Sequence, residues 1–365
     1  MEPEVRHKPV RYYAIDLLRF IAALAVVLFH FTYRGYHADH LSPVDYPALG
    51  AVFKYGYLGV ELFFIISGYV VLLSAQGKTL GQFVISRITR LYPAYWVACT
   101  FTFLVQSIGK PAGPGTTWPT PLEASARVYA VNMTMFQNFL RVPDLDGVYW
   151  TLKVELVFYL VIALLIICKG FRHLVPVLAG WLAYCLYFGP VASGRPLSFL
   201  LFPRFAPFFI AGMLFYMLQT SQAAPWKLYA LLLASYVASL WSTQVVLAET
   251  VAVYQQPFSL PVAYAAVTSF FGVFLLIIHR RLRVGQASWL AWAGALTYPI
   301  YLLHHNTGYV AFQRLGGFVP KYTLLAGLLL AVFGLAYLLH VQVERRFSKP
   351  LSQLLQKWLA RLGLG

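Results

Sequence analysis

Residues 13–33 read YAIDLLRFIAALAVVLFHFTY, an apolar stretch interrupted by Asp16, Arg19 and His30. It follows a basic segment, but it is longer than the apolar part of a secretory signal peptide and has no small-residue cleavage site. A helix of this length spans the roughly 30 Å hydrocarbon core of a bilayer. A charge placed there costs about 2.5–3.5 kcal/mol on insertion scales, so it pairs, lines a cavity or takes part in chemistry. We interpret residues 13–33 as a retained membrane helix with a polar stripe.

The whole chain, like residues 13–33, is rich in apolar residues and poor in charged ones. Of its 365 residues, 60% are hydrophobic and 11% are charged, and the mean hydropathy is +0.67. Soluble domains carry about 45–50% apolar and about 25% charged residues. This composition argues against a soluble enzyme, a disordered chain and a nucleic-acid-binding module. The excess of 28 Lys and Arg over 12 Asp and Glu then reflects topology and anionic membrane lipids, and we expect no nucleic-acid partner.

Measured against the roughly 20 apolar residues that a spanning helix needs, the sequence predicts an all-α integral membrane protein with about ten transmembrane helices. The predicted spans cover approximately residues 13–33, 56–75, 91–108, 149–168, 174–190, 204–219, 226–247, 258–279, 288–310 and 322–342.

Basic residues predict the orientation of these spans. An even number of spans places both termini on one side, and the segments on that side carry nearly twice as many Lys and Arg residues as the others. The positive-inside rule then makes both termini cytoplasmic. Residues 346–365 place leucines and Trp358 at helical spacing opposite Lys357 and Arg361, which is typical of an interfacial helix. We divide the chain into a membrane domain, residues 1–345, and a cytoplasmic amphipathic tail, residues 346–365.

The polar stripe of the first span joins three residues. Arg19 and His30 are eleven residues apart, so on a helix they face the same way, about 16 Å apart along the axis. Asp16 precedes Arg19 by three residues and joins the stripe. The pair Asp16 and Arg19 has a simpler interpretation as an ion pair that fixes the first helix.

The direction of each span arranges the other polar residues in two layers. The inner layer is basic, and the outer layer combines imidazoles with carboxylates. A basic inner mouth suits a phosphorylated cytoplasmic donor, and a His–carboxylate site suits general-base catalysis on a hydroxyl. Simple membrane anchoring of the arginines and plain packing of the late histidines remain alternatives. The inner layer contains Arg19, Arg87 and Arg90, and the outer layer contains His30, Glu61, Glu155, His304 and His305.

Five segments, in order, resemble the motifs of the acyltransferase-3 family, which are integral-membrane O-acyltransferases of surface polysaccharides. The first runs from DLLRFIAA at 16–23 to His30 and keeps the family's spacing of ten residues between Arg and His. Ser86, Lys153 and Leu156 depart from the family pattern of a paired Arg, a Ser and a second Glu. The other four segments are GVELFFIISGY at 59–69, FVISRITRLYP at 83–93, WTLKVELVFYL at 150–160 and YPIYLLH at 298–304.

The resemblance implies a donor, an acceptor and a location. The donor is acyl-CoA, most simply acetyl-CoA, and Arg19, Arg87 and Arg90 hold its phosphates. The acceptor is a hydroxyl of a glycan or lipid-linked glycan at the outer face of a bacterial cytoplasmic (inner) membrane, where the protein is expected as a multi-pass membrane protein among membrane lipids. The long outer connection, residues 109–148, is expected to help bind this glycan, with Trp118 and Tyr149 as stacking candidates.

The resemblance also assigns the chemistry. His30 would act as general base, and Glu155 would orient its imidazole and stabilise the charged form of that ring. Asp16, Glu61, Ser67 and His304 support the site.

Three alternatives stay open. In a two-step variant, His30 or Ser67 carries the acyl group transiently. The main rival is a transporter or flippase, because buried charges and Pro-interrupted helices also mark transport paths. A third interpretation is a non-catalytic sensor with the same fold. We expect no metal site, because adjacent residues such as His304 and His305 point to different faces of a helix.

Overall fold

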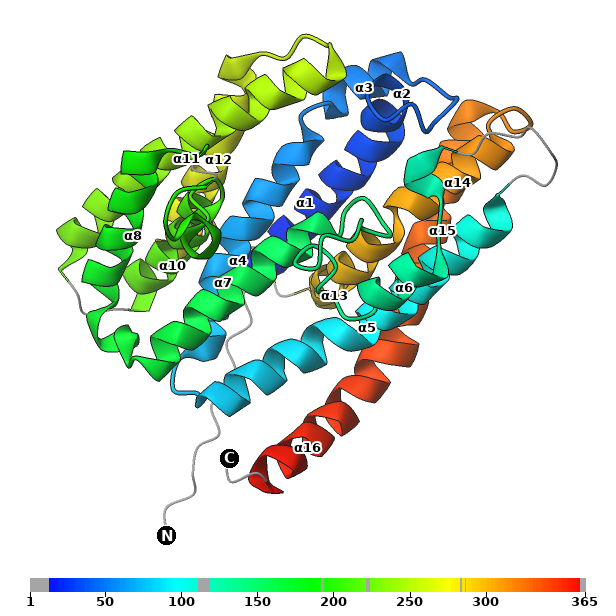
Figure 1. Ribbon diagram of the computed structural model, residues 1–365. Coiled ribbons are helices and arrows are strands. Elements are labelled where there is room, and N and C mark those ends of the chain that lie inside the picture. Colours follow the sequence, from blue (N-terminus) through cyan, green and yellow to red (C-terminus); the bar gives the residue numbers. More distant parts are fainter. Residues whose placement is uncertain are drawn as a thin grey trace.

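The computed structural model describes residues 13–110, 119–191, 194–220, 224–282, 284–285 and 287–361. Throughout these ranges the regular structure is helical (Figure 1). The helices longer than two turns are α1 (Tyr13–Phe29), α4 (Gly59–Ala75), α5 (Leu80–Gly109), α7 (Trp150–Ile167), α8 (Leu174–Phe188), α10 (Ala206–Thr220), α11 (Pro225–Tyr254), α12 (Leu260–Ile278), α13 (Ser288–Leu303), α14 (His305–Leu315), α15 (Lys321–Leu339) and α16 (Arg345–Arg361). Short elements are η1 (His30–Arg34), α2 (Gly35–His37), α3 (Pro47–Phe53), η2 (Gly56–Leu58), η3 (Thr120–Leu122), α6 (Ala126–Asn132), η4 (Gly170–His173), α9 (Ser198–Leu201) and η5 (His340–Glu344).

Each of the ten predicted spans falls on a helix. In the described part of the chain, seven helices are long and apolar enough to cross a membrane. The other three predicted spans fall on α5, on the shorter apolar helix α10, and on α13 followed by α14. Large apolar side chains such as Ile108, Leu330 and Tyr187 face outward and are exposed. Such a surface is expected to face lipid, and the chain is a multi-pass membrane protein.

Helices α4 and α10 form the tightest packing in the bundle. A Cβ atom added at Gly68 would lie 2.0 Å from the carbonyl oxygen of Phe209, and one added at Gly212 would lie 2.0 Å from that of Ile65. Each glycine therefore admits the backbone of the opposite helix, as small residues do between membrane helices. The contact fixes the position of α4, which carries Glu61 and Ser67.

The N-terminus of α5 is capped before its two arginines. The hydroxyl of Thr79 accepts from the backbone N–H of Gln82, and the Gln82 side chain accepts from the backbone N–H of Thr79. This capping box satisfies donors that a helix start leaves unpaired. Arg87 and Arg90 follow in the next turns.

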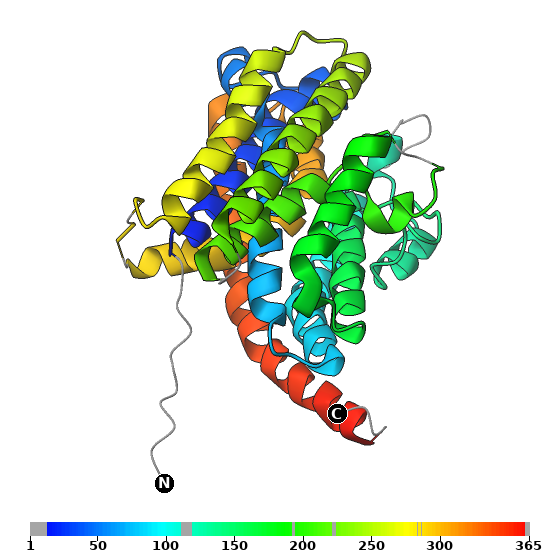
Figure 2. The same cartoon turned by 90° about the vertical axis from the view of Figure 1, so that its left-hand side faces the viewer.

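The C-terminal part of the chain is one long helical segment. Helix α15 continues through the π-helix η5 into α16, which packs along α5. Figures 1 and 2 both show α16 extending beyond the rest of the bundle at one end. The expected amphipathic tail is helical in the structure from Arg345 to Arg361.

Candidate active site

A cavity of about 460 Å³ lies between α1, α4, α5, α7, α13 and the start of α16. It gathers the three arginines of the predicted inner layer, which come from two helices. Its polar and charged lining residues are Asp16, Arg19, Ser67, Arg87, Arg90, Thr151, Glu155, Tyr159, Thr297, Tyr298, Tyr301, His340, Glu344, Arg345 and Ser348.

The arginines of this cavity differ in their partners. Arg19 Nη1 lies 3.7 Å from Asp16 Oδ1, so the expected ion pair forms. The guanidinium of Arg87 lies over the rings of Phe83 and Tyr159, at 5.6 and 5.5 Å from their centroids. Among the described residues, no carboxylate lies within 4 Å of the charged groups of Arg87 or Arg90. Their charges are therefore available to an anion that enters the cavity.

Glu155 lies in this cavity with the arginines. Its Oε1 accepts from the hydroxyl of Tyr159 and lies 3.5 Å from Ser67 Oγ. We expected Glu155 to orient the imidazole of His30, but the described hydrogen bonds of His30 go elsewhere. The structure thus corrects this pairing and connects Glu155 and Ser67 to the cavity.

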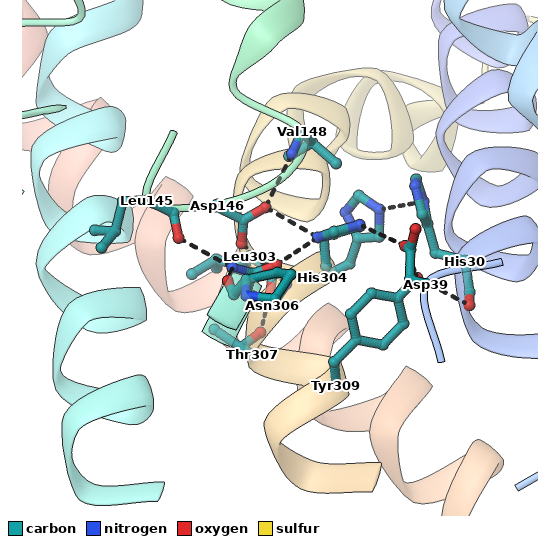
Figure 3. A network of polar contacts seen from close by, with 12 residues as sticks. His30, Asp39, Leu145, Asp146, Val148, Leu303, His304, Asn306, Thr307 and Tyr309 are labelled. Atoms are coloured by element: carbon teal, nitrogen blue, oxygen red, sulfur yellow. Dashed lines mark hydrogen bonds and ion pairs between the residues drawn. The ribbon is translucent and has the colours of Figure 1, made fainter. Parts of the chain in front are cut away.

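His304 lies beside His30 instead. Nε2 of His304 is 3.1 Å from Nδ1 of His30 (Figure 3). His304 Nδ1 lies 2.9 Å from the carbonyl oxygen of Tyr301, and His30 Nδ1 lies 2.9 Å from that of Val26. Carbonyl oxygens only accept, so both Nδ1 atoms carry hydrogen in neutral imidazoles. His304 Nε2 then accepts from the Nδ1–H of His30. The other ring nitrogen of His30, Nε2, carries no hydrogen and has a basic lone pair.

His305 also reaches this group because the helix breaks between α13 and α14. The ring of His305 meets that of His30 edge-on, with centroids 4.5 Å apart, and the centroids of His304 and His30 are 5.0 Å apart. We expected the adjacent histidines to face different sides of one helix. The interruption at His304 overturns that expectation. In the described residues, no group of three or more His, Cys, Asp or Glu side chains has metal-binding geometry.

Two carboxylates face His305 from loops. Asp146 Oδ1 is 3.4 Å from Nδ1 of His305, and Asp39 Oδ2 is 3.9 Å from its Nε2. Asp146 is completely buried, and it also accepts from the backbone N–H groups of Asn306 and Val148. Asp39 is paired with Arg34 at 2.8 Å. These contacts restrain the imidazole of His305. Figure 3 shows Asp39 and Asp146 in one polar network with His30 and His304.

Sequence reasoning missed both aspartates. Asp146 belongs to the connection before α7, part of which folds onto α5: Tyr95 and Trp96 donate to the backbone carbonyls of Asn132 and Met133. The signal available was the acidic pair in PDLDG, residues 143–147, close to the start of a span. Trp118, one of the two stacking candidates, lies outside the described residues. Tyr149 is fully buried against Tyr95, so it offers no face to a sugar.

Tyr301 lies between the cavity and the histidines. Its ring lines the cavity and lies 5.7 Å from the ring of His304. Its hydroxyl is 2.9 Å from the Thr151 hydroxyl, another lining group. The ring of Tyr301 therefore stands between the arginine cavity and His304.

Glu61 is not among the described residues that line the arginine cavity. It is buried in the first turn of α4, and its Oε2 has no hydrogen-bond partner among the described residues. We expected Glu61 near His30 and His304, but the described hydrogen bonds of these two histidines go to other residues.

A protein-family match covers most of this chain, and two individual relatives match shorter parts of it. Residues 12–341 match the family described as "Acyltransferase domain". The chain is similar to Nodulation protein 10 of Rhizobium leguminosarum bv. viciae, with 28% identity over 183 residues, which cover 46% of this chain and 47% of that protein. It is similar to Acyltransferase MdmB of Streptomyces mycarofaciens, with 28% identity over 162 residues, which cover 41% and 38% of the two chains. The chain thus aligns with less than half of the length of each relative, and no solved structure matches it. Because the family match covers far more than half of the sequence, the chain belongs to this acyltransferase family.

Proposed function

We propose that the protein transfers an acyl group, most simply acetyl, from acyl-CoA at the arginine cavity to a hydroxyl group near His30. The observation that carries this proposal is the position of Tyr301, which lines the cavity on one side and packs against His304 on the other. Family membership supports acyl transfer as the reaction class.

The cavity fits an anionic donor. Arg87 and Arg90 have no described carboxylate partner, and Arg19 lies on the same lining. Coenzyme A carries a 3′-phosphate and a diphosphate, groups that guanidinium binds in bidentate fashion. Because Arg19 and His30 share one helix, a pantetheine arm running along α1 from Arg19 would present its thioester toward His30.

The tautomer of His30 suits a general base. Its Nδ1–H faces two acceptors, and its Nε2 has no hydrogen bond to a described residue. Nε2 would take the proton of the acceptor hydroxyl as its oxygen attacks the thioester carbonyl, and the proton would then pass to the departing thiolate. Val26 and His304 would stabilise the imidazolium by accepting from its Nδ1–H.

The acceptor is proposed as a glycan or lipid-linked glycan at the outer face of a bacterial cytoplasmic (inner) membrane. With both termini cytoplasmic, α1 runs outward, so Arg19 lies toward the inner side and His30 toward the outer side. The family resemblance supports the glycan, and the apolar outer surface of the helices supports the membrane location.

The test uses purified protein in nanodiscs with [14C]acetyl-CoA. Wild type should bind it and slowly transfer or hydrolyse the acetyl group, and His30→Ala should bind without turnover. His279→Ala is the matched control, because His279 is exposed and contacts Tyr229. Turnover by His30→Ala would remove His30 from the chemistry. Flipping of a lipid-linked glycan that continues without acyl-CoA would instead favour a transporter.

A further inference from the structure

Part of the lining of the arginine cavity comes from residues that lie beyond the family match. The matched region ends at residue 341, but Glu344, Arg345 and Ser348 line the same cavity as Arg87 and Arg90. They stand at the junction of η5 and α16. The packing of α16 along α5 brings this junction to the two arginines of α5.

Glu344 has a close partner of its own in His340. Glu344 Oε2 lies 2.5 Å from Nδ1 of His340, one turn earlier in the π-helix. Among the described residues, no carboxylate lies within 4 Å of the guanidinium of Arg345. Glu344, the acid next to Arg345 in the sequence, therefore contacts the imidazole of His340 and not Arg345.

An aromatic ring supports Arg345 without using its hydrogen-bond donors. The Arg345 guanidinium lies 5.8 Å from the centroid of the Trp292 ring, which meets the His340 ring at 5.6 Å. A cation–π contact restrains a guanidinium while its N–H groups stay available to a ligand. Arg345 itself is exposed at the rim, so a ligand can reach it from outside the cavity.

We propose that Arg345 binds a phosphate of the nucleotide part of acyl-CoA, so that α16 completes the donor site from outside the family domain. This proposal rests on the proposed function, because it takes acyl-CoA as the donor. Arg87, Arg90 and Arg345 then surround a ligand with several negative charges, and phosphate is the group that such a cluster recognises.

The experiment compares two ligands in full-length protein in nanodiscs. Equilibrium binding of [14C]acetyl-CoA, and its displacement by S-acetylpantetheine, which lacks phosphates, are measured for wild type, Arg345→Ala, Arg345→Lys and Arg346→Ala. Arg346 is the matched control, because it is the next residue of α16, has the same charge and is absent from the described cavity lining.

Arg345→Ala should raise the Kd for acetyl-CoA roughly tenfold, the size expected for one charge-assisted hydrogen bond, and leave the displacement constant of S-acetylpantetheine unchanged. Arg345→Lys should recover part of the loss, and Arg346→Ala should bind as wild type does.

Four results would overturn the proposal. Arg345→Ala could bind acetyl-CoA normally, or Arg346→Ala could lose as much affinity. Equal weakening of both ligands would show that Arg345 only maintains the shape of the wall. Wild type that binds no acyl-CoA would overturn the proposed function as well, whereas the other results leave that function standing.

Discussion

Nδ1 of His30 lies 3.1 Å from Nε2 of His304, and the two imidazoles come from opposite ends of the chain. His304 Nδ1 faces the carbonyl oxygens of Ile300 and Tyr301, which fixes its hydrogen. The direction of the bond between the imidazoles follows, since only one nitrogen of each neutral ring can donate. His304 and the carbonyl oxygen of Val26 therefore together set which nitrogen of His30 is basic.

Replacing His304 with Phe should lower kcat by about 10–100-fold, because the acceptor for His30 Nδ1–H is lost and the hydrogen bond to the charged imidazole is worth about 1.5–3 kcal/mol. The Kd for acetyl-CoA should stay within about twofold. His304→Gln, whose amide oxygen can accept, should lose less. Both constants are measured with labelled acetyl-CoA in nanodiscs, and normal turnover by His304→Phe would exclude this role.

Gly147 controls the position of His305. A Cβ atom there would lie 2.4 Å from Cε1 of the imidazole, so Gly147→Ala should displace the ring and lower kcat at least tenfold, with a stability loss of about 1–3 kcal/mol. Gly180→Ala is the control, because nothing lies within 4 Å of its added Cβ. Equal activity of the two variants would show that the imidazole position does not matter.

The two imidazoles and the arginines illustrate what the sequence could predict. Apolar length located the helices, and the order of spans placed Arg19 with Arg87 and Arg90, which share one cavity in the structure. Hydropathy sets the depth of a residue but not the direction its side chain faces. The sequence therefore predicted His30 as the partner of Glu155, whereas in the structure Glu155 accepts from Tyr159.

Residues outside the spans were harder to place. His305 turns toward His30 because the helix is interrupted at His304, and a periodic pattern does not locate such a break. Asp39 and Asp146 come from connections whose paths depend on tertiary contacts. Hydropathy carries no signal for those contacts.

Arg87 should not tolerate lysine. Its planar guanidinium lies over the rings of Phe83 and Tyr159, and an ammonium group keeps the charge but loses the fork that binds phosphate. Arg87→Lys should raise the Kd for acetyl-CoA about three- to tenfold, a loss of roughly 0.7–1.4 kcal/mol. Arg172→Lys, an exposed basic site, is the control. Unchanged affinity in Arg87→Lys would argue for simple charge attraction.

Gly212→Ala should destabilise the bundle, because its new Cβ would meet the carbonyl oxygen of Ile65. Overpacking of this kind costs about 1–3 kcal/mol, and here a backbone atom cannot move aside easily. The thermal unfolding midpoint in detergent should fall by several degrees. Gly272→Ala has open space and should unfold at or above the wild-type temperature. A wild-type midpoint for Gly212→Ala would show that the helices separate freely.

The glycine contact between α4 and α10 also bears on how the chain is made. Ribosomes add about 5–20 residues per second, so α4 is complete roughly 7–30 seconds before the helix that carries Gly212. During this interval the face of α4 around Gly68 is open to lipid or to the insertion machinery. Nascent chains arrested before α10 lack the partner that fits against Gly68. Completion of α10 is thus the earliest point in synthesis at which this helix pair can form.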